Sequence, residues 1–104
     1  MEHYEVLVSE SFHRDLTNIV YYLAHQLDAP LAASSFLANV EKTVESLSFM
    51  PYRFSLVDDA YLRPKGFRKC VIKNYLLFYR IREEDKTIAI HRLLHTKQNW
   101  LQIL

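Results

Sequence analysis

Two stretches of the chain repeat apolar residues at helical spacing. The first runs from Ser9, a favoured N-cap residue, and carries one apolar stripe: Phe12, Leu16, Ile19, Val20, Leu23 and Leu27. The second begins near Pro30 and ends at Pro51, with its own stripe: Ala33, Phe36, Leu37, Val40, Val44 and Leu47. These spacings predict two amphipathic helices, and the short link around residue 28 makes them antiparallel neighbours in a helical hairpin.

Period-two alternation predicts strands on either side of this hairpin. Residues 3–8 form a short first strand, and three more follow at 67–73, 75–82 and 87 to about 95. Short turns near Asn74 and at 83–86 predict antiparallel hairpins between the last three strands. Residues 51–66 are expected to form a loop pinned against the core, and residues 96–104 a short terminal helix. The predicted fold is one α+β domain over 1–104, β-α-α-β-β-β, with the helical hairpin on one face of an antiparallel sheet.

The alternation also divides the strand residues between two faces. On the middle strand, Tyr75, Leu77, Tyr79 and Ile81 are expected to face the helices, and Leu76, Phe78, Arg80 and Arg82 the other side. On the last strand, Ile88, Ile90, Arg92 and Leu94 are expected on one side. The helix-free face would then mix cations with apolar groups. Such a face is suited to a polyanion or an acidic protein.

The charge of the chain is divided unevenly. Residues 1–52 hold two basic and seven acidic side chains, a net of −5, and residues 53–104 hold eleven basic and five acidic, a net of +6. This asymmetry favours an anionic partner for the second half, although acidic helices and a basic sheet also occur for solubility alone.

Composition excludes several classes of cofactor and location. The single glycine, Gly66, rules out glycine-rich phosphate loops, so neither ATP nor NAD is expected as a cofactor, and no other cofactor is predicted. The single cysteine, Cys70, suits a reducing compartment and is interpreted as a buried strand residue. No apolar run reaches about 18 residues, which predicts a cytoplasmic protein without a membrane partner. His91 and His95 would lie about 13 Å apart on a strand, so no metal site is predicted.

Several motifs, in their order and spacing, resemble one protein family. They are SESFHRDL at 9–16, SLSFMP at 46–51, KGFRK at 65–69, NYLLFYRI at 74–81 and IAIHRLLHTKQNW at 88–100. Together these motifs resemble the RelE/ParE superfamily of bacterial toxins from type II toxin–antitoxin systems. The resemblance spans essentially the whole chain. It implies a compact toxin whose sheet face and C-terminal segment meet a target, and which a cognate antitoxin wraps and neutralises.

The two branches of this superfamily differ in what they imply. Toxins similar to RelE enter the ribosome and cut mRNA, whereas those similar to ParE poison DNA gyrase and lack the nuclease residues. RelE-like nucleases commonly place an arginine after the tyrosine that opens the middle strand, where this chain has Leu76, and a tyrosine or histidine in the tail, near Ile103 here. These departures slightly favour a ParE-like inhibitor, with a metal-independent mRNA endonuclease as the alternative. A simple interaction module is the third hypothesis.

The candidate site residues follow from charge, from chemistry and from the resemblance. Should the chain cut RNA, the expected catalytic residues are His95, Lys69 and Arg92, because cleavage needs proton transfer and cations around the phosphate. The expected target or nucleic-acid contacts are Arg63, Lys65, Arg68, Lys69, Lys73, His91, Arg92, Lys97 and Trp100. His91 and His95 are equally compatible with ordinary strand-edge residues, and Trp100 with packing on the sheet. An acidic amphipathic antitoxin segment is expected along the helical seam and the sheet face.

Overall fold

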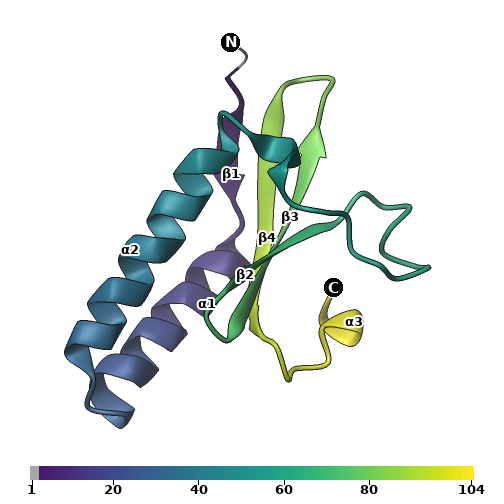
Figure 1. Ribbon diagram of the computed structural model, residues 1–104. Helices are drawn as coiled ribbons and strands as arrows, with labels where there is room; N and C mark the ends of the chain where they lie inside the picture. The colour runs from purple at the N-terminus through teal and green to yellow at the C-terminus, as the bar shows by residue number, and fades with distance from the viewer. Residues whose placement is uncertain (1–2) are drawn as a thin grey trace.

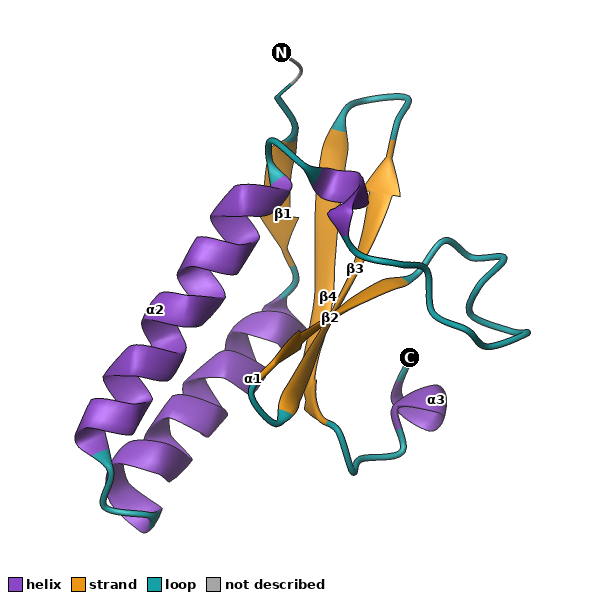
Figure 2. Ribbon diagram, viewed as in Figure 1, coloured by secondary structure: helices purple, strands orange, loops and turns teal. Residues whose placement is uncertain are grey.

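The computed structural model describes residues 3–104 and confirms the predicted α+β fold, with helices packed against one sheet (Figures 1 and 2). The elements are β1 (Glu5–Val8), α1 (Glu10–Tyr21), the π-helix η1 (Tyr22–Gln26), α2 (Pro30–Leu47), the 3-10 helix η2 (Pro51–Arg53), β2 (Arg68–Ile72), β3 (Tyr75–Arg82), β4 (Thr87–His95) and α3 (Trp100–Ile103). Each predicted helix and strand is therefore present, most with bounds within two residues of those expected.

The sheet is mixed rather than antiparallel throughout. Its strand order is β1-β4-β3-β2, with antiparallel pairs β2–β3 and β3–β4, but β1 pairs with β4 in parallel. The path of the chain explains why β1 and β4 run in the same direction. The helical hairpin returns the chain to the end of the sheet where β1 began, so β2 runs in the direction of β1, and two hairpin turns give β4 that direction again (Figure 1).

Ser9 begins α1 and joins it to the sheet. Its Oγ accepts a hydrogen bond from the Phe12 backbone N–H at 2.9 Å, which confirms the predicted N-cap, and donates to the backbone oxygen of His91 at 2.7 Å. One side chain thus satisfies a free amide at the helix start and fixes the position of α1 on β4.

The main core lies between the helices and the sheet. Its buried members include Phe12 of α1, Phe36 and Val40 of α2, and Leu77 and Tyr79 of β3, as the two periodicities predict. Leu27 is an exception, because its side chain is 53% exposed. The π-helical turn of η1 widens the helix and changes the helical register before the stripe reaches Leu27.

A second core covers the opposite face of the sheet, where an open working surface was expected. Its buried members are Val57, Leu62, Phe67, Leu76, Phe78 and Leu94. Val57, Leu62 and Phe67 come from the long loop before β2. Trp100 and Leu104, near the C-terminal end, pack against this core. The loop closes at Gly66, whose φ of 84° is a conformation that glycine adopts without strain. The prediction of an exposed helix-free face is therefore wrong where the loop and the C-terminal segment cover Leu76, Phe78 and Leu94.

A β-bulge breaks the alternation in β4. Phe78 pairs with Arg92, whereas the next residue, Tyr79, pairs with Ile90, so His91 is the extra residue on this strand. Ile90 and Leu93 both belong to the helix-side core, and Leu94 belongs to the other. The predicted grouping of Ile88, Ile90, Arg92 and Leu94 on one face is thus wrong beyond Ile90.

Candidate functional site

Lys69 and Trp100 lie together on the side of the sheet away from the helices. The Trp100 ring stacks at a tilt of 35° on Phe78, with ring centroids 5.4 Å apart, and the Lys69 Nζ lies 5.4 Å from the Trp100 ring centroid. Trp100 therefore packs on the sheet while part of its ring stays accessible beside a cation. Both members of this pair are predicted site residues.

A second cationic and aromatic group surrounds Phe67. The Arg80 guanidinium lies 5.3 Å from the Phe67 ring centroid, and the His91 ring meets the same ring edge-on at 5.1 Å. Burial first, and then the charges of Arg80 and Arg82, lower the pKa of His91, so its imidazole is favoured in the neutral form. Arg80 is absent from the predicted site, although it follows Phe78 by two residues on β3 and therefore lies on the same face.

Arg92 is held by α1 instead of facing a ligand. Its Nε and Nη2 donate to the two carboxylate oxygens of Asp15 at 2.7 and 2.9 Å, and the Leu93 backbone N–H donates to the same carboxylate at 3.0 Å. The hydrogen bond to Asp15 raises the pKa of Arg92, and its side chain is only 28% exposed. Its charge is thus neutralised inside the fold.

His95 occupies a third environment, on the helix side of the sheet. Its ring meets Tyr75 edge-on at 5.2 Å, and its Nδ1 accepts a hydrogen bond from the Lys97 backbone N–H at 3.1 Å. Lys69 lies beside Trp100, Arg92 is paired with Asp15 and His95 packs on Tyr75. The three residues predicted to act together in RNA cleavage are therefore not assembled around one point.

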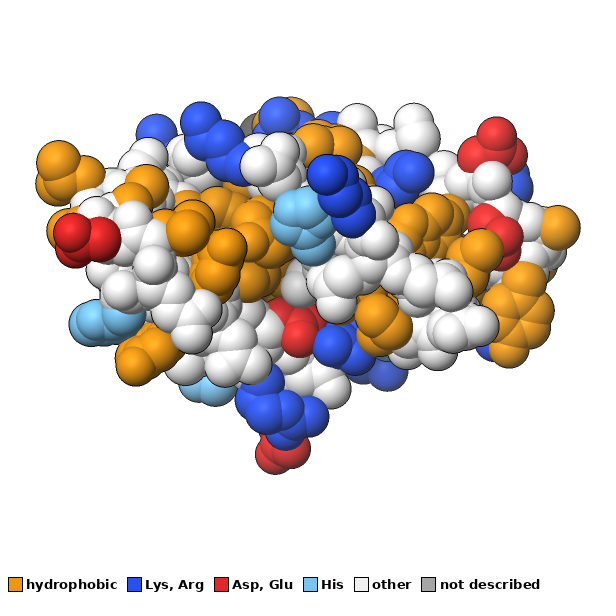
Figure 3. Space-filling model, turned by 90° about the horizontal axis from the view of Figure 1, so that it is seen from below, with side chains coloured by type: hydrophobic (Ala, Val, Ile, Leu, Met, Phe, Trp, Pro, Cys, Tyr) orange, Lys and Arg blue, Asp and Glu red, His pale blue; other side chains and the backbone are white. Residues whose placement is uncertain are grey.

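The remaining predicted cations lie in separate places. Arg68 donates to the Phe54 backbone oxygen at 2.7 Å and covers the Tyr52 ring at 4.9 Å, while Lys65 donates to the Tyr61 hydroxyl at 2.7 Å on the long loop. Arg63 is exposed on that loop, Lys73 lies in the β2–β3 turn with a φ of 56°, and Lys97 is exposed after β4. Seen from below, Lys and Arg side chains form several groups separated by hydrophobic and polar ones (Figure 3). On this face of the molecule, the expected single basic platform is not formed.

Two structural findings bear on other classes of site. Within the described residues 3–104, no group of three or more His, Cys, Asp or Glu side chains is arranged to hold a metal ion. Over the same range, none of the helices is both long and apolar enough to cross a membrane.

Comparisons with known proteins place this fold in a family. A family model described as the ParE toxin of the type II toxin–antitoxin system parDE matches residues 6–100. One similar solved structure is the toxin–antitoxin complex RelBE2 from Mycobacterium tuberculosis, at 26% identity and a TM-score of 0.62, over 89% of this chain and 98% of that chain. No curated protein sequence matches the chain significantly.

Two further structures are similar in fold. One is the chromosomal ParDE system from P. aeruginosa, with a TM-score of 0.70 at 15% identity over 89% of this chain and 96% of that chain. The other is a metal-bound toxin from Helicobacter pylori, with a TM-score of 0.55 at 19% identity over 88% of this chain and 93% of that chain. Because the family model spans nearly the entire chain, this protein belongs to the ParE toxin family of type II toxin–antitoxin systems.

Proposed function

We propose that this toxin arrests growth by binding and inhibiting DNA gyrase, without breaking a bond itself, and that a cognate antitoxin neutralises it. The observation that carries the proposal is the match of residues 6–100 to the ParE family. The separation of Lys69, Arg92 and His95 supports inhibition by binding, because general acid–base catalysis needs its groups within reach of one substrate.

The surface around Trp100 and Phe67 is the proposed contact with the target. It offers a partly accessible indole beside Lys69, and the Arg80 guanidinium and the His91 ring beside Phe67. Aromatic residues and arginine at the centre of a contact contribute most of the binding energy in protein interfaces.

A gyrase assay tests the proposal directly. Purified chain added to gyrase and relaxed plasmid should inhibit supercoiling, and addition of the cognate antitoxin should restore it. Lys69→Ala should weaken inhibition by roughly tenfold through the lost charge beside Trp100, whereas Glu84→Gln, at an exposed position on the β3–β4 turn, should leave it unchanged. Full supercoiling at saturating toxin would reject gyrase as the target.

The alternative function is cleavage of mRNA at the ribosome. It is favoured by the 26% identity to the toxin–antitoxin complex RelBE2. Primer extension on cellular mRNA after expression of the chain separates the two functions, because a nuclease leaves cuts near codon boundaries and a gyrase inhibitor leaves the messages intact. Under the nuclease hypothesis, His95→Ala abolishes the cuts. If expression without antitoxin causes no growth arrest, the interaction-module hypothesis replaces both.

A further inference from the structure

An open apolar groove of about 620 Å³ runs between β1 and the helical hairpin, and none of the predicted site residues lines it. Its apolar walls come from β1, α1 and α2: Val6, Val8, Phe12, Leu16, Val40 and Val44. Figure 1 shows β1 at the edge of the sheet next to α2. Among the described residues 3–104, no strand pairs with the outer side of β1, so the groove lies beside an open sheet edge.

The free edge of β1 leaves backbone groups of Val6 and Val8 without a strand partner. The amides of Glu5 and Ser9 donate to the β4-side oxygens of Lys86 and Ile90, each at 3.0 Å. In a parallel ladder alternate residues bond to the same neighbour, so the N–H and C=O groups of Val6 and Val8 point outward, toward the groove. A covering segment must satisfy these groups, because burying them unpaired is costly.

This requirement selects an extended segment over a helix. The backbone groups of a helix are bonded within the helix, whereas an added strand offers free N–H and C=O groups to Val6 and Val8. The other edge of the sheet is less open to pairing. There the Lys69 amide donates to Ser55 at 3.3 Å and Leu56 bridges to Arg68, so the loop covers part of β2. By contrast, β1 presents Leu7 and Val8, which are 42% and 53% exposed.

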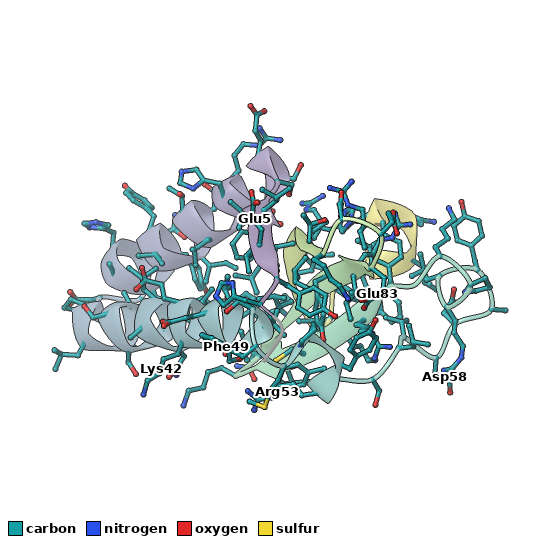
Figure 4. The ribbon with its side chains drawn as sticks, turned by 90° about the horizontal axis from the view of Figure 1, so that it is seen from above. Glu5, Lys42, Phe49, Arg53, Asp58 and Glu83 are labelled. Atoms are coloured by element: carbon teal, nitrogen blue, oxygen red, sulfur yellow. The ribbon has the colours of Figure 1, made fainter. Side chains whose placement is uncertain are left out.

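The rim of the groove is acidic. Glu5, Glu41 and Glu45 line it together with His3 and His13, and no lysine or arginine of the described residues does so. These three glutamates also form no ion pair within the part of the chain that the structure describes. Glu41 and Glu45 lie one turn apart on α2, where like charges repel each other. Lys42 lies on the side of α2 away from Glu5 (Figure 4) and lines a different hollow, with Val71 and Lys73.

We propose that an extended, lysine- or arginine-bearing segment of the cognate antitoxin pairs with the free edge of β1 and fills this groove with its apolar side chains. This inference rests on the proposed neutralisation by an antitoxin and specifies the chemistry of the contact. It replaces the acidic segment expected along the helical seam. A second copy of this chain is disfavoured as the occupant, because it would bring another acidic rim against the same glutamates.

Two synthetic peptides test the groove without reference to toxicity. Both are capped nonapeptides with valine at alternate positions, one with lysine and threonine between the valines and one with glutamate and threonine. The lysine peptide should slow hydrogen exchange at the Val6 and Val8 amides. At low salt it should bind at least about tenfold tighter than the glutamate peptide, and this difference in affinity should shrink at high salt. Equal binding of both peptides, or protection confined to β2, would overturn the proposal.

Variants extend the test to the cognate antitoxin. The double variant Glu41→Lys, Glu45→Lys should bind the antitoxin at least about tenfold more weakly, because two like charges then face the segment. The matched control is Glu84→Lys, which changes an exposed residue of the β3–β4 turn. The double variant should still arrest growth but escape neutralisation. Unchanged or tighter antitoxin binding overturns the proposal, whereas absence of growth arrest by the unaltered chain rejects only the toxin function.

Discussion

Glu83 is the acceptor for three donors from different parts of the chain. Its carboxylate accepts hydrogen bonds from the Tyr4 hydroxyl at 2.9 and 3.0 Å, from the Tyr52 hydroxyl and from the Lys86 ammonium. The β3–β4 turn is thereby joined to the residue before β1 and to η2. The hydrogen bond from Lys86, followed by those from Tyr52 and Tyr4, lowers the pKa of Glu83 from 4.5 to about 2.

This lowered pKa predicts a pH dependence of stability. Because the folded state prefers ionised Glu83, its contribution is fully present above pH 4.5 and is lost as the pH falls toward about 2. Glu83→Gln should therefore lower the Tm at pH 7, and its difference from the unaltered chain should vanish near pH 2. Thermal unfolding across this range checks the prediction. Glu84→Gln removes the same charge from the same turn and should show no such convergence.

Asp15 and Arg92 form the most buried ion pair among the described residues, with side chains 13% and 28% exposed. Removing Asp15 leaves both the Arg92 guanidinium and the Leu93 amide unpaired. Asp15→Ala should therefore cost about 1–3 kcal/mol of unfolding free energy. Denaturant unfolding of Asp15→Ala, Arg92→Ala and the double variant measures the coupling. A coupling near zero would show that the pair does not stabilise the fold. The sequence alone did not reveal this pair, because its members lie 77 residues apart.

At the scale of elements, one hydroxyl fixes η2 to the sheet. The Tyr79 side chain is fully buried on β3, and its hydroxyl donates to the Pro51 backbone oxygen at 2.7 Å. Burial raises the pKa of Tyr79 to about 12, so the phenol remains a donor at neutral pH. This bond positions the chain at the point where it leaves α2 for the long loop.

Removing the Tyr79 hydroxyl should destabilise the fold, while the ring that fills the core is kept. Tyr79→Phe leaves the Pro51 oxygen without its partner, so we expect a loss of about 1–2 kcal/mol in unfolding free energy. Tyr75→Phe is the matched control, because Tyr75 lies on the same strand and no hydrogen bond of its hydroxyl occurs within residues 3–104. Equal losses for the two variants in urea unfolding would show that the hydroxyl bond contributes nothing.

Periodicity predicted the elements well and their irregularities poorly. The stripes through Phe12 and Phe36 and the alternation of Leu77 with Phe78 place these residues correctly, because each depends on local geometry. The bulge at His91 and the π-helical turn before Leu27 each shift a register, and neither has a marker residue in the sequence. The candidate site was chosen by charge and chemistry rather than by register. Lys69 and Arg92 lie on either side of Phe78 across the sheet, but Asp15 binds the Arg92 guanidinium and His95 packs on Tyr75.

At the scale of the whole molecule, one sheet divides two cores of different construction. The larger core is closed by the helical hairpin, whereas the smaller is closed by the long loop and by Trp100 and Leu104 near the chain end. A loop and a four-residue helix provide less cooperative cover than two packed helices. The smaller core is therefore expected to open locally while the rest of the domain stays folded.

Hydrogen exchange on Trp100→Ala tests this division. Loss of the indole removes the contact with Phe78 and the cover of the smaller core, at a cost of about 1–3 kcal/mol. The amide of Val57, which donates to Phe67 at 2.8 Å, should then exchange at least about tenfold faster. Amides of Leu77 and Tyr79 in the middle of β3 should keep their protection, and Leu101→Ala, at a 46% exposed position, should change neither. If β3 loses protection in step with the loop, the two cores open as one cooperative unit and the surface around Trp100 cannot adjust to a target independently of the helices.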